Sequence, residues 1–85
     1  MRYENETLMA KFTFADGKQV WREMMQSMIQ TEEDDLLTTE EEVRDLFYSL
    51  YFNDDEDFTS VDLEYSAHPL NGKGNDVCIT TRIER

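Results

Sequence analysis

The chain has 85 residues and a formal net charge of −12, a length that suits one small domain spanning residues 1–85. Because one Trp, four Tyr and five Phe accompany this charge, we expect a packed core rather than a disordered acidic chain. Cys78 and His68 are each the only residue of their type, which excludes an internal disulfide and a zinc site built from Cys and His. No apolar run approaches the ~18–20 residues of a membrane span and residues 1–6 lack a signal-peptide core, so we expect a cytoplasmic protein without membrane contact.

The first predicted element is a strand over residues 7–14. Leu8, Ala10, Phe12 and Phe14 alternate with other side chains in this segment. A period of two that includes aromatic residues is typical of a half-buried strand.

Residues 16–30 are the main local ambiguity. Asp16-Gly17 between two apolar runs is a strong hairpin signal. On a helical wheel, however, the apolar residues of this segment fill one half of the circle and the polar residues fill the other half. The apolar set comprises Val20, Trp21, Met24, Met25, Met28 and Ile29. We therefore predict a helix with Asp16 as its N-cap, Gln19 at the capping-box position, and the apolar stripe packed in the core.

An acidic loop is predicted over residues 31–35, because four carboxylates would crowd the negative C-terminal end of the preceding helix. A second helix should begin at Thr38 or Thr39. The hydroxyls of these residues precede Glu41 and Glu42 by three positions, which is the spacing of a capping box.

The second predicted helix is amphipathic. Its apolar stripe, expected to be buried, comprises Val43, Leu46, Phe47, Leu50 and Tyr51. Glu41, Asp45 and Tyr48 lie on the opposite side of the wheel and are expected to face solvent.

Two further strands are predicted over residues 58–66 and 77–84, where apolar side chains alternate with polar ones. Pro69, Asn71-Gly72 and Gly74 indicate a loop between these strands. The predicted order is β-α-α-β-β. The fold class is therefore α+β, a small two-layer domain with two helices packed on one face of a three-stranded antiparallel sheet.

A calcium loop is the most tempting motif in the acidic region. An EF-hand register that starts at Asn53 would use Asn53, Asp55, Asp57 and Glu64 as ligands. The position that requires Gly for a sharp turn holds Phe58, so this register fails. A loose divalent-ion site among Asp54, Asp55 and Asp57 is favoured over an EF-hand but would be weak, so we expect no functional metal site and no cofactor.

Other candidate chemical groups favour structural interpretations. Gly72-Lys73-Gly74 lacks the upstream Gly and the following Ser or Thr of a phosphate-binding loop. His68 precedes Pro69 and is expected to be a turn residue rather than a catalytic base. Cys78 is expected to be a buried, inert thiol. With its acids in loops and on an outward helix face, the chain is expected to have no catalytic residues and no enzymatic activity.

Acidic residues are concentrated in residues 32–64. This segment holds fourteen Asp and Glu against the single base Arg44, while the remainder holds six acids and seven Lys or Arg. The segment therefore carries −13 and the remainder +1, which sum to the net charge of −12. Solubility alone would account for a solvated acidic surface. However, self-repulsion on this scale costs stability, which favours a role in binding a basic partner.

The predicted partner-binding residues lie in this segment, and the clusters at 32–35, 54–57 and 62/64 could extend one track along a single side of the domain. They are Glu32, Glu33, Asp34, Asp35, Glu41, Asp45, Tyr48, Asp54, Asp55, Glu56, Asp57, Asp62 and Glu64. Charge repeated along a helix imitates the spaced phosphates of a nucleic acid. The predicted partner is therefore a basic nucleic-acid-binding protein, with no direct binding of nucleic acid by the chain itself. A homodimer is compatible with this pattern.

In size and acidity the chain resembles the small phage-encoded inhibitors of restriction enzymes, CRISPR effectors and other host DNA-binding proteins. The resemblance is one of composition and covers no motif. It implies a non-enzymatic inhibitor that blocks a basic DNA- or RNA-binding groove in the host-cell cytoplasm. Two alternatives remain open, namely an immunity protein or antitoxin that neutralises a cationic nuclease, and an acidic accessory subunit of a larger assembly.

Overall fold

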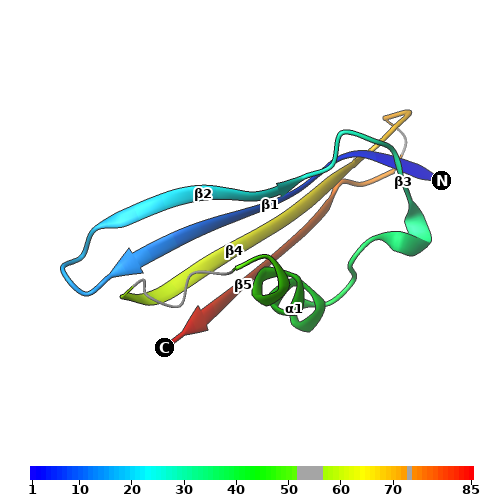
Figure 1. Cartoon of the computed structure of the whole chain (residues 1–85). Coiled ribbons are helices and arrows are strands. Elements are labelled where there is room, and N and C mark those ends of the chain that lie inside the picture. Colours follow the sequence, from blue (N-terminus) through cyan, green and yellow to red (C-terminus); the bar gives the residue numbers. More distant parts are fainter. Residues whose placement is uncertain (52–56, 73) are drawn as a thin grey trace.

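The computed structural model describes residues 1–51, 57–72 and 74–85. In these ranges the chain forms five antiparallel strands in one sheet and one α-helix (Figure 1). The strands are β1 (Arg2–Phe14), β2 (Gln19–Gln26), β3 (Thr31–Glu32), β4 (Phe58–Pro69) and β5 (Val77–Glu84). A 3₁₀-helix η1 (Glu33–Asp35) and the α-helix α1 (Glu40–Leu50) lie between β3 and β4.

The sheet has the order β2-β1-β4-β5, and the short β3 pairs with the start of β1. Helix α1 lies against one face of this elongated sheet, and no helix of the described residues covers the other face, which we call the open face (Figure 1). The predicted arrangement, an α+β domain with two helices on a three-stranded sheet in β-α-α-β-β order, is therefore wrong. The structure is mostly sheet and replaces the first predicted helix with a strand.

The hairpin signal decides the conformation of residues 16–26. Gly17 adopts a φ of 88°, and its amide donates to the Phe14 carbonyl at 2.8 Å. The Phe14 amide donates to the Lys18 carbonyl at 2.9 Å. Asp16 Oδ1 accepts from the Lys18 amide at 2.9 Å, so Asp16 stabilises a β-turn and does not cap a helix.

A β-bulge hides the strand pattern of β2 in the sequence. Leu8 pairs with Met25 and Met9 pairs with Glu23, which leaves Met24 without a partner in the register. The extra residue brings two consecutive Met side chains into partly buried positions and breaks the period of two.

The apolar stripe of the rejected helix is not a core stripe. Trp21, Met28 and Ile29 expose 56%, 88% and 76% of their surface. The strand conformation wins because it pairs the backbone of β1 on its second side, which a helix cannot do.

The predicted second helix is confirmed as α1. Thr39 is its N-cap and forms the predicted capping box with Glu42. Val43 and Phe47 are fully buried against the sheet. The strands predicted over 7–14, 58–66 and 77–84 are also confirmed, although β1 begins five residues earlier and β4 ends three residues later.

The core lies between α1 and the helix-covered face of the sheet. The Phe12 ring of β1 lies 6.0 Å from the Phe47 ring of α1 and 5.0 Å from the Phe58 ring of β4. The buried cluster comprises Leu8, Ala10, Phe12, Val43, Phe47, Phe58, Val61, Leu63, Tyr65 and Ile83. This packing fixes which side of α1 faces solvent.

Candidate protein-binding surface

One of the three glutamates in the first turn of α1, Glu42, forms the cap of the helix. Glu42 Oε1 accepts from the Thr38 hydroxyl at 2.9 Å and from the Thr39 hydroxyl at 3.0 Å. It also accepts from both threonine amides. These hydrogen bonds, led by the Thr38 hydroxyl, lower the pKa of the Glu42 carboxyl below its ordinary value. Glu42 Oε1 therefore caps the helix that carries the neighbouring exposed acids.

A buried hydrogen-bond network fixes the segment that leads into α1. The fully buried Tyr65 donates its hydroxyl to Glu6 Oε2 at 2.5 Å and accepts from the Leu37 amide at 3.2 Å. Glu6 Oε1 also accepts from the Thr31 hydroxyl at 3.2 Å. Burial, followed by the hydrogen bond to Glu6, raises the pKa of Tyr65. Leu36 is buried with Tyr3 and Ala67 in a second cluster, so residues 36–37 are held against the helix-covered face.

Exposed carboxylates lie on both sides of this anchored segment, on η1 before it and on α1 after it. We call them the acidic face. It comprises Glu33, Asp34, Asp35, Glu40, Glu41 and Asp45. The first three belong to η1 and the others to α1.

Tyr48 lies on the same stripe of α1 as Glu41 and Asp45 and is 59% exposed. Its ring stands edge-on to the buried Phe47 ring at 5.7 Å. The ring is therefore supported from below while its outer face stays open. The predicted exposure of Glu41, Asp45 and Tyr48 is confirmed.

The basic residue inside the acidic segment does not neutralise the acidic face. Arg44 Nη1 donates to the Thr81 hydroxyl of β5 at 2.7 Å, so its charge points at the sheet. Glu32, by contrast, is paired with Arg2 at 2.9 Å. The charge of Glu32, one of the predicted contact residues, is therefore partly neutralised within the molecule.

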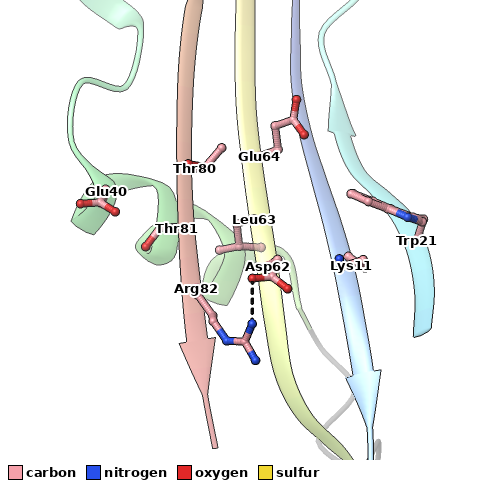
Figure 2. Close-up of a pocket in the computed structure, with 9 residues that line it drawn as sticks. All are labelled: Lys11, Trp21, Glu40, Asp62, Leu63, Glu64, Thr80, Thr81 and Arg82. Atoms are coloured by element: carbon pink, nitrogen blue, oxygen red, sulfur yellow. Dashed lines mark hydrogen bonds and ion pairs between the residues drawn. The ribbon is translucent and has the colours of Figure 1, made fainter. Parts of the chain in front are cut away.

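Asp62 and Glu64 do not join the acidic face. The intervening Leu63 is buried under α1, and alternation along β4 sends both acids to the open face of the sheet. Lys11 and Arg82 flank Asp62 in the register. Arg82 Nη1 lies 3.4 Å from Asp62 Oδ1 (Figure 2). The single track that the sequence suggested is thus divided between two faces of the sheet.

A shallow hollow of about 390 Å³ extends across the open face from Trp21 on β2 to Arg82 on β5, and Glu40 of α1 also lines it (Figure 2). Lys11 Nζ lies 5.6 Å from the centroid of the Trp21 ring, within cation–π range. Lys11 and Arg82 thus lie next to Asp62 on this face. Its charge is mixed, unlike that of the acidic face.

Three predicted contact residues, Asp54, Asp55 and Glu56, lie outside the described residues, as do Asn53 and Asp55 of the rejected EF-hand register. Asp57 is exposed immediately before β4. Within residues 1–51, 57–72 and 74–85, no group of three or more His, Cys, Asp or Glu side chains is arranged to hold a metal ion.

The structure places both His68 and Cys78 differently from the prediction made from the sequence. His68 lies in β4, where its Nδ1 is 3.1 Å from Asp76 Oδ1, so it belongs to a strand end rather than to the turn itself. Cys78 is exposed, and the expectation of burial is wrong because alternation along β5 places it on the open face. In the part of the chain that is described, no helix is long and apolar enough to cross a membrane.

Sequence reasoning missed the residues that position the acidic face. Glu6 and Tyr65 are 59 positions apart, and neither carries a local signal of pairing. Glu40 was treated only as a helix-start residue, although its exposure makes it part of the surface. Comparison of the chain with protein-family models, curated proteins and solved structures identified no match.

Proposed function

We propose that the protein is a non-enzymatic inhibitor whose acidic face occupies the basic groove of a nucleic-acid-binding protein. The observation that supports this most strongly is the arrangement of exposed carboxylates on η1 and α1. No basic side chain among the described residues pairs with Glu33, Asp34 or Asp35 of η1, and Arg44 is directed at Thr81. An acidic surface left uncompensated within its own chain is suited to a cationic partner.

The helix supplies a regular spacing of charge. Glu41 and Asp45 are one turn apart, which corresponds to an axial advance of about 6 Å. One strand of a duplex carries one phosphate per about 3.4 Å of helix axis, so the axial advance between the two carboxylates corresponds to roughly two nucleotides. Lys and Arg side chains that normally hold phosphate oxygens would form charge-assisted hydrogen bonds with them.

Tyr48 supplies the apolar contact in this proposal. An exposed aromatic ring beside charged groups is the kind of residue that dominates binding energy when a partner covers it. Its edge-on packing against Phe47 limits the entropy that the ring loses on binding.

The test is competition for a nucleic-acid site. Purified protein is added to fluorescent duplex DNA bound to each member of a panel of restriction endonucleases, RNA-guided nucleases and cationic toxin nucleases. We expect displacement of the DNA from at least one panel member. Displacement only from a toxin nuclease would favour the immunity or antitoxin alternative.

A matched pair of double variants assigns the effect to the acidic face. Glu41→Gln with Asp45→Lys changes the net charge by +3, and Glu4→Gln with Glu23→Lys changes it equally on exposed strand positions. The helix variant should weaken displacement about tenfold or more, because each lost charge contact of ~1.4 kcal/mol is a factor of ten. The strand variant should change it less than about threefold. Equal losses, or no displacement by the unmodified protein from any panel member, would contradict the proposal.

A further inference from the structure

The outer edge of β5 is a long, regular strand edge. Every residue from Ser60 to Ala67 of β4 pairs in unbroken register with Glu84 to Val77 of β5. Among the described residues, no strand pairs with the other side of β5. Eight residues of strand extend about 27 Å and present a row of backbone donors and acceptors that another strand can bind.

The opposite edge of the sheet is interrupted. The bulge at Met24 breaks the register of β2, and a bulge twists an edge away from further pairing. If two copies of the chain paired through β2, a two-fold axis at Arg22 would place two guanidinium groups opposite each other, and an axis at Glu23 would place two carboxylates opposite each other. The uninterrupted edge is therefore β5.

The side chains of β5 that face α1 form a palindrome. Ile83 is buried, Ile79 packs against the same core, and Thr81 between them accepts from Arg44. A two-fold axis perpendicular to the sheet at Thr81 sets Thr81 opposite its own copy and each Ile79 opposite Ile83 of the second copy. Pairs of β-branched residues and Thr–Thr pairs both stabilise antiparallel strands.

The β5 edge carries little net charge, so it opposes self-pairing less than the acidic segments of the chain would. Residues 77–85 contain two Arg and one Glu, a charge of +1 in a chain of −12. Glu40 lines a hollow together with Thr80, Thr81 and Arg82, and lies beside β5 on the side away from β4 (Figure 2). In the pairing centred on Thr81, Arg82 of the second copy lies opposite Thr80 on the open face of the sheet, where each Arg82 also contacts Asp62 and Glu84 of its own chain.

From this edge we propose that two copies of the chain pair through β5 in an antiparallel arrangement centred on Thr81. The two-fold axis keeps both α1 helices on one face of the joined sheet, so the two acidic faces lie on the same side. This inference rests on β5 and does not depend on the proposed inhibitory function.

Salt should favour formation of the dimer. Each copy carries −12, so long-range repulsion opposes association and salt relieves it. Light scattering coupled to size-exclusion chromatography should give a mass that rises with concentration from 10.1 kDa towards twice that value. The rise should be larger in ~1 M than in ~0.1 M NaCl, where the Debye length is ~3 and ~10 Å respectively.

Disulfide trapping tests the register. In a Cys78→Ser background, Thr81→Cys should form a covalent dimer on mild oxidation, because directly opposed Cβ atoms lie about 4.5–5.5 Å apart. Gln19→Cys on β2 is the control and should stay monomeric. Circular dichroism verifies that both variants are folded.

Each outcome bears on the proposal. A concentration-dependent dimer with selective trapping at position 81 supports it. A monomeric mass at all concentrations and salts would overturn it. So would a dimer in which position 81 is trapped no faster than position 19, since association would then use another surface.

Discussion

Replacing Tyr65 by Phe should destabilise the protein far more than the loss of one oxygen suggests. The hydroxyl is fully buried, donates to Glu6, and accepts from the Leu37 amide. A hydrogen bond to a charged group contributes about 1.5–3 kcal/mol and a neutral one about 0.5–1.5 kcal/mol. The variant should therefore lose about 2–4 kcal/mol of unfolding free energy, a large share of the ~4–13 kcal/mol that suits a chain of this length.

Thermal unfolding followed by circular dichroism measures this loss. At ~4–8 °C per kcal/mol for a domain of this size, the midpoint should fall by at least ~8 °C. Hydrogen exchange of the Leu37 amide should accelerate beyond the global change, because that amide loses its acceptor. Tyr48→Phe, on the exposed side of α1, is the control and should stay within ~0.5 kcal/mol. A loss below ~1 kcal/mol in Tyr65→Phe would refute the anchoring role of the network.

Three further predictions concern the turn, the helix cap and nucleic acids. Gly17→Ala should lose about 1–2 kcal/mol in urea unfolding, because Gly17 has a φ of 88°; an unchanged midpoint would contradict the turn geometry. The lowered pKa of Glu42 means that its contribution is complete above its unfolded pKa and is lost as pH falls through its folded pKa. Glu42→Gln should therefore flatten the acid side of the stability profile, whereas an unaltered profile would exclude the cap as its source. The protein should not bind duplex DNA at low salt, and a gel shift would overturn this.

Local signals predicted the parts of the fold that local chemistry determines. Thr39 and Glu42 are three residues apart, and the capping box that they form defines the start of α1. Because the stripe that follows has a helical period, its buried and exposed sides were predicted correctly. β5 alternates throughout and β4 alternates from Val61 onward, and both strands were predicted.

Non-local contacts account for what could not be predicted. β2 is a strand because β1 offers it a second edge, and the bulge at Met24 disguises its alternation. The contact between Tyr65 and Glu6 joins residues that are 59 positions apart in the sequence. The division of the acidic track was, by contrast, implicit in the sequence, because a strand that buries Leu63 under a helix must turn Asp62 the other way.

The salt dependence of DNA displacement tests the central proposal most directly. For a panel member from which the protein displaces duplex DNA, the dissociation constant of the protein complex is measured between ~50 and ~200 mM NaCl. The acidic face predicts affinity that falls steeply with salt, and a clearly shallower fall for the Glu41→Gln, Asp45→Lys variant than for the Glu4→Gln, Glu23→Lys control. Displacement from no panel member, or the same slope for both variants, would contradict the assignment of binding to the acidic face.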